Sequence, residues 1–181
     1  MAILKPLVAA ATLILAAPAI AQDARGMDDL FTALGTAEGA DADRIVEKIV
    51  AEWSKSGSPA MDMLLQRGRD ALEAGDTDRA IEHFGALVDH APDFAEGYNA
   101  RATAFFADGE YGLAIDDIRH TLDLNPRHFG AMTGLAVILG QIERPGQALE
   151  VWRKVLELYP DSPQAAAILP TLEAEVEGST L

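Results

Sequence analysis

The sequence contains no cysteine among its 181 residues. A disulfide, a thiolate zinc site, a thiol nucleophile and a lipid-modified cysteine are therefore all excluded. Stability must come from the packing of apolar side chains, which make up 49% of the residues, a share typical of globular proteins. A chain of this length is expected to form one domain.

Positive charge is scarce. The 14 lysines and arginines are outnumbered by 29 aspartates and glutamates, which gives a formal net charge of −15 at pH 7. Such a chain is repelled by nucleic acids and by anionic membrane surfaces. Neither is expected as a partner.

The chain has one marked apolar run, at 7–17, and it is too short for a helix that crosses a bilayer. The run follows a single cation, Lys5, and precedes Pro18 and a triplet that ends at Ala21. This order is typical of a secretory signal peptide, so we expect residues 1–21 to be removed and no stable membrane anchor to remain. With no Asn-x-Ser/Thr acceptor present, the leader predicts a bacterial periplasmic protein, and secretion to the medium is the alternative.

Groups that could carry out catalysis do not converge in the sequence. It has no His-Glu-x-x-His, no Gly-x-Ser-x-Gly, no phosphate-binding loop and no dinucleotide fingerprint. Asp116 and Asp117 point about 100° apart on a helix, and we expect both to be solvated. We expect surface or boundary positions for all four histidines, His83, His90, His120 and His128. No enzyme activity, cofactor or metal is predicted.

Equivalent residues recur 34 positions apart through most of the chain. The equivalent sets are Leu64, Tyr98 and Met132; Gly75 and Gly109; Ala80, Ala114 and Ala148; Phe84, Ile118 and Trp152; and Pro92, Pro126 and Pro160. Each unit holds two helical stripes of apolar residues joined by a short turn, which indicates a helical hairpin. Because one such hairpin cannot bury its apolar face, neighbouring hairpins must stack.

These columns resemble the tetratricopeptide repeat, whose order is W-x₂-L-G-x₂-Y, then A-x₃-F, then P. The resemblance implies an all-α fold, a right-handed α-solenoid of helix-turn-helix repeats. The repeats are expected at 59–94, 95–128 and 129–162. We expect the ends of the stack to be covered by an N-terminal helical hairpin within 22–58 and by a C-terminal capping helix and tail at 163–181, kinked or split at Pro170.

Two arginines depart from the repeat pattern. Arg67 and Arg101 stand where the family usually has leucine. Each is expected either to pair with a nearby acid or to contact a partner. The acids expected are Glu47 or Glu52 for Arg67, and Glu82 or Asp89 for Arg101.

Two local patterns concern helix ends and helix interiors. Asp93 lies three residues before Glu96, which predicts a capping box for the helix that follows. Gly130, Gly134 and Gly140 lie inside a predicted helix, where each costs about 1 kcal/mol relative to alanine. Close approach by a bound segment, packing of a neighbouring helix, and tolerance of a weak helix all remain open as explanations.

In known family members the first helices of the repeats line a concave groove that binds peptides or a partner's helix. The resemblance implies a groove made here by Leu65, Arg69, Asn99, Thr103, Phe106, Thr133, Val137 and Gln141. A grip on a free C-terminal carboxylate is not expected, because only Arg69 and Asn99 suit it. We predict a periplasmic adaptor or scaffold that binds a protein or peptide. The alternative is a structural or homo-oligomeric subunit of an envelope complex, with its groove self-occupied.

Overall fold

The computed structural model describes residues 19–178, with side chains from residue 26 onward. The run at 7–17, which carries the signal-peptide prediction, lies outside the described residues. The described part of the chain forms helices joined by short turns, with no strand. The helices are α1 (Ala19–Leu34), α2 (Ala40–Trp53), α3 (Pro59–Glu73), α4 (Thr77–His90), α5 (Ala95–Ala107), α6 (Tyr111–Leu124), α7 (Phe129–Gln141), α8 (Pro145–Leu158) and α9 (Pro163–Gly178).

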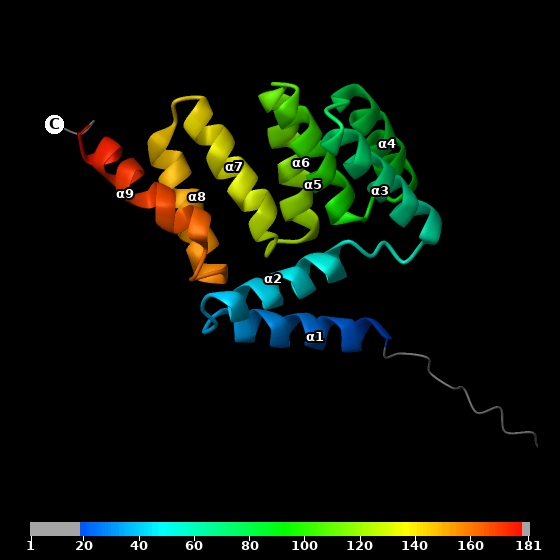
Figure 1. The fold of residues 1–181 in the computed structure, drawn as a ribbon, viewed down its shortest axis with the longest axis horizontal. Coiled ribbons are helices and arrows are strands. Elements are labelled where there is room, and N and C mark those ends of the chain that lie inside the picture. Colours follow the sequence, from blue (N-terminus) through cyan, green and yellow to red (C-terminus); the bar gives the residue numbers. More distant parts are fainter. Residues whose placement is uncertain (1–18, 179–181) are drawn as a thin grey trace, which may run out of the picture.

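Helices α3 to α8 form three helical hairpins that stand side by side in chain order (Figure 1). Each hairpin packs on the next, α4 against α5 and α6 against α7. The predicted all-α solenoid of three repeats is confirmed.

The turn inside each hairpin contains one residue in the left-handed backbone conformation. Gly75 and Gly109 have φ of 76° and 81°, a region that glycine enters without steric cost. At the equivalent place in the third hairpin stands Glu143, with φ of 58°. Asp76 caps α4, because its side chain accepts a hydrogen bond from the Arg79 N–H.

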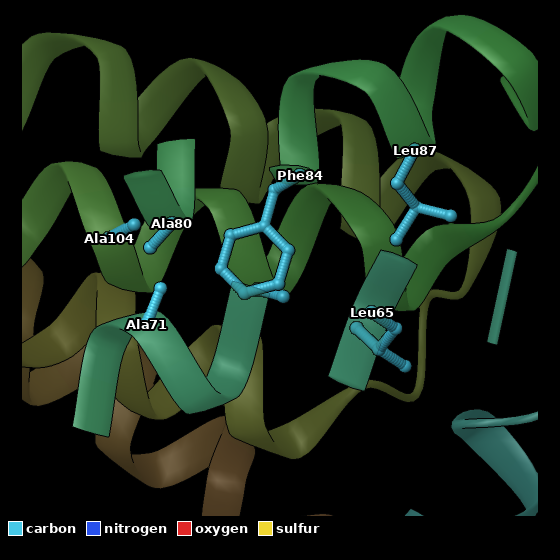
Figure 2. Close-up of a cluster of buried hydrophobic side chains, with 7 residues drawn as sticks. Leu65, Ala71, Ala80, Phe84, Leu87 and Ala104 are labelled. Carbon is cyan, nitrogen blue, oxygen red and sulfur yellow. The ribbon is translucent and has the colours of Figure 1, made fainter. Parts of the chain in front are cut away.

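The core of the first repeat depends on one close approach between helices. Phe84 of α4 is fully buried (Figure 2). Its ring occupies the space where Gly68 of α3 has no side chain. A Cβ placed on Gly68 would lie 2.3 Å from Cε1 of that ring. The ring is surrounded by a cluster of small and apolar residues: Leu65, Ala71, Ala80, Leu87 and Ala104.

The N-terminal hairpin, α1 and α2, is present but lies across the repeats instead of covering the outer end of the first one (Figure 1). Ile49 and Trp53 of α2 join a cluster with Phe129 of α7 and Tyr159, which follows α8. The Gly39 N–H also donates to the Asp161 carboxylate at 2.7 Å. The expected position of this hairpin was therefore wrong: it connects the first repeat to the end of the third.

The last helix, α9, covers the open side of the third repeat. Ala165 and Leu172 pack into one cluster with Trp152 of α8. The helix continues through Pro170, so of the two predicted alternatives, a kink or a split, the split is wrong. Pro170 itself is exposed to solvent.

Candidate functional site

Three adjoining cavities form one trough along α7. The first, of about 390 Å³, lies between α5 and α7, and the second, of about 590 Å³, lies between α7, α8 and α9. The third, of about 490 Å³, is bounded by α2, α7 and the start of α9. Thr133 and Gln164 line all three. We call this continuous surface the trough.

The lining of the trough is apolar, with scattered amides and hydroxyls. Val137 and Ile168 supply exposed apolar surface and Phe106 is half-buried, while Asn99 and Gln141 offer amide groups. Of the side chains that line the three cavities, only that of Glu175 carries a charge at neutral pH. Such a surface suits the side chains and backbone of another polypeptide.

Six of the eight residues predicted for the groove line this trough. Asn99, Thr103 and Phe106 line the first cavity, Thr133 and Val137 line the first and second, and Gln141 lines the second. Their contact with a partner stays a prediction. Leu65 was placed wrongly, because it is only 2% exposed and belongs to the core of the first repeat.

The eighth predicted residue, Arg69, is held by a buried carboxylate. Glu96 at the start of α5 is 7% exposed and accepts hydrogen bonds from Arg69, from Asn99 at 3.1 Å and from His128 at 3.0 Å. Arg69 also donates to the Ser54 hydroxyl at 3.1 Å. Glu96 therefore neutralises the one cation predicted to line the groove.

The capping box expected at Asp93 and Glu96 is absent. The N-cap residue of α5 is Phe94, and no side chain caps this helix. The Glu96 side chain instead takes part in the network with Arg69, Asn99 and His128, which sequence spacing alone does not reveal.

His128, expected near the surface, is 2% exposed and is the N-cap residue of α7. Its Nδ1 accepts a hydrogen bond from the Ala131 N–H at 3.1 Å. A backbone donor at Nδ1 places the ring hydrogen on Nε2, which donates to Glu96. The imidazole also stacks on Trp53 of α2, with ring centroids 4.1 Å apart. His128 thus joins α2, α5 and α7 and leaves no free nitrogen for catalysis.

Arg101 has a partner that was not predicted. Its guanidinium forms two hydrogen bonds with the Asp117 carboxylate, of 2.7 and 2.8 Å. This bond raises the pKa of Arg101 above its usual value, with burial acting in the opposite direction. Asp117 is buried, so its predicted solvation was wrong, as was the pairing of Arg101 with Glu82 or Asp89.

Arg67 occupies the corresponding place in the first repeat, on an open surface beside Asp76 and His83. Within residues 26–178 no ion pair joins it to Glu47 or Glu52. The expected partners are absent because the N-terminal hairpin does not cover this end of the stack.

The glycines of α7 line the trough, and packing does not require two of them. A Cβ on Gly140 would meet no atom within 4 Å, and one on Gly134 would lie an ordinary 3.6 Å from Cδ1 of Ile118. A Cβ on Gly130 would lie 3.4 Å from the His128 ring. Close packing by a neighbouring helix therefore does not explain Gly134 or Gly140.

The described residues contain no group of three or more histidine, aspartate or glutamate side chains placed to hold a metal ion. Among the same residues, no helix has the length and apolarity that a membrane span requires.

A stack of helical hairpins with a trough along α7 is an α-solenoid. The tetratricopeptide repeat profile matches residues 65–128 and 102–163, and the chain belongs to this family. Members of the family are in general modules for protein interaction.

One curated relative is a TPR repeat-containing protein of Rhizobium etli, 33% identical over 84% of this chain and 76% of its own length. The chain spans 29% and 35% of the length of two further curated relatives.

Two solved structures illustrate the shared fold. The first TPR of Spaghetti (RPAP3), bound to the HSP90 peptide SRMEEVD, superposes with a TM-score of 0.62 at 21% identity, over 65% of this chain and 93% of that one. The Yersinia enterocolitica secretion chaperone SycD, in complex with a peptide of the translocator YopD, gives 0.61 at 17% identity, over 65% and 95%.

Proposed function

We propose that this chain is a non-enzymatic adaptor of the bacterial periplasm that binds a peptide or helix of an envelope protein in the trough. The observation that carries the proposal is the continuity of the three cavities along α7, which leaves an open apolar surface next to amides and hydroxyls. The peptides bound by the Spaghetti (RPAP3) domain and by SycD support a similar use of the fold here.

The N-terminal hairpin bounds the trough without filling it. Val46 of α2 lines the third cavity, and the first two remain open beyond it. A groove occupied by this hairpin would leave no room for a partner. The open cavities therefore favour the adaptor over the self-occupied structural subunit.

The periplasmic location is proposed from the sequence at 1–21 alone. Fractionation of cells that express the full chain tests it, with N-terminal sequencing of the product. We expect a periplasmic protein that begins at Gln22. A cytoplasmic product that retains residues 1–21 would contradict the location and leave the binding function unaffected.

Site-specific photo-crosslinking in living cells tests the binding function. A photoreactive residue at Val137, which is 37% exposed in the trough, is expected to capture a partner. The matched control is Met63, which is 53% exposed on α3 and lines none of the three cavities. Equal capture from both positions, or capture from Met63 alone, would contradict the assignment of the trough.

A further inference from the structure

The charges around the trough indicate which polypeptide segments it accepts, an inference that rests on the proposed function. No lysine or arginine lines the three cavities, and two arginines outside them are already paired: Arg69 with Glu96, and Arg127 with Asp28 at 2.8 Å. An acidic segment therefore finds no free positive charge in the lining. Its own charges would instead add to the repulsion from a chain of net charge −15.

At the opposite end of the trough, Glu175 of α9 lines the second cavity and is exposed. Within the described residues it forms no ion pair, whereas Glu173, on the same helix, pairs with Arg153 at 3.2 Å. A lysine or arginine that reached Glu175 would find an available carboxylate beside apolar surface. Electrostatic complementarity of this kind selects partners and speeds their encounter.

The lining of the second cavity is apolar and includes a position without a side chain. Val137 and Ile168 expose apolar surface beside Gly140, where the helix carries no side chain. Because no neighbouring atom lies within 4 Å of a Cβ on Gly140, this space is available to an occupant from outside the chain.

We propose that the trough binds an apolar segment of a partner protein that carries lysine or arginine at the end next to Glu175, and that it rejects acidic segments. The apolar part supplies most of the affinity, and the basic end gives direction and selectivity.

Two labelled synthetic peptides test the proposal. They share one apolar core of leucine and alanine, and they differ in that one is flanked by lysine and the other by glutamate. Fluorescence anisotropy with the full mature chain is expected to give a Kd about tenfold lower for the lysine peptide, a difference that shrinks as salt is raised. Equal affinities, or tighter binding of the glutamate peptide, would overturn the proposal and leave the proposed function standing.

Two matched variants test whether Glu175 causes the preference for the lysine peptide. Glu175→Gln is expected to reduce the preference for the lysine peptide by about threefold. Glu150→Gln, which removes an exposed charge of α8 outside the three cavities, is expected to leave that preference nearly unchanged. Equal effects of the two variants would show a diffuse attraction to the acidic surface and would overturn the role of Glu175.

A variant that fills the second cavity distinguishes failure of this inference from failure of the proposed function. Gly140→Leu places a side chain in the second cavity and is expected to weaken the lysine peptide at least about tenfold. If neither peptide binds the unmodified chain, or if Gly140→Leu changes nothing, the trough is not the binding site and the proposed function fails as well.

Trp152 reports on the second cavity, which it lines. The sequence has two tryptophans, so in the variant Trp53→Phe all tryptophan emission comes from Trp152. Its emission is expected to shift when the lysine peptide binds.

Light scattering of the free chain tests whether a second copy occupies the trough. A stable dimer that Gly140→Leu abolishes would place a second copy there and overturn the proposal.

Discussion

The indole of Trp53 stacks on the imidazole of His128, with ring planes 19° apart, and this contact fixes the N-terminal hairpin to the start of the third repeat. Arg69 of the first repeat donates to Ser54, the residue after Trp53. The end of α2 therefore touches both the first and the third repeats. This end of α2 braces the stack along one edge, and Val46 in the middle of the same helix lines the third cavity of the trough.

Loss of the His128 side chain is expected to weaken this brace. His128→Ala removes the N-terminal cap of α7, one partner of the buried Glu96 and the stacking surface of Trp53. We expect the free energy of unfolding to fall by about 2–4 kcal/mol. Urea denaturation measures this change.

His128→Asn is the matched control, because asparagine is also a good N-cap residue. It is expected to lose about 1 kcal/mol less than His128→Ala. Equal losses in the two variants would show that the cap contributes nothing.

Sequence periodicity predicted the repeats because each repeat buries the same positions. Ala80, Ala114 and Ala148 are all buried, as a stack of equal hairpins requires. The position of the N-terminal hairpin could not be predicted in this way. The apolar stripe of α2 shows that one face is buried, but it does not identify what covers that face.

The partner of Arg101 was missed for a related reason. Asp117 lies on the other helix of the same repeat, and its equivalents are His83 in the first repeat and Val151 in the third. The pair therefore occurs in one repeat only and leaves no periodic signal. A search within each hairpin for opposite charges at equivalent places would have found it.

Removal of Arg101 alone is expected to destabilise the second repeat. Arg101→Leu leaves the Asp117 carboxylate buried without its cation, and we expect a loss of about 2–3 kcal/mol, since Arg101 is partly exposed. The double variant with Asp117→Val reproduces the apolar pair Leu135 and Val151 of the third repeat. It is expected to recover most of the loss in chemical denaturation. A double variant as unstable as the single one would show that the ion pair itself is required.

Two glycines of first helices are expected to respond in opposite directions to alanine. Gly68→Ala forces a Cβ to within 2.3 Å of the Phe84 ring, which has no room to move, and should cost about 1–3 kcal/mol. Gly140→Ala meets no neighbour and should raise stability by up to about 1 kcal/mol. Urea denaturation of both variants checks the signs. A loss of stability in Gly140→Ala would mean that the chain itself needs this glycine.

The acid dependence of stability can be predicted at the start of the first repeat. Asp62 accepts hydrogen bonds from the Ser56 hydroxyl at 2.6 Å and from its backbone N–H at 2.8 Å. These bonds lower the pKa of Asp62 below its ordinary value of 3.8, and the hydroxyl has the larger effect. Because the folded state holds the proton less tightly than the unfolded state, the stabilisation is complete above the unfolded pKa. It is lost as the pH falls through the folded pKa.

Asp62→Asn should therefore reduce stability at neutral pH, and its deficit relative to the unmodified chain should shrink in acid below about pH 4. Ser56→Ala is the matched variant, because it removes the hydroxyl but keeps the backbone N–H. Carboxyl NMR titration is expected to place the Asp62 midpoint below 3.8 in the unmodified chain and to move it upward in Ser56→Ala. A midpoint that does not change in Ser56→Ala would show that the hydroxyl does not hold the carboxylate, and the pH dependence would then need another origin.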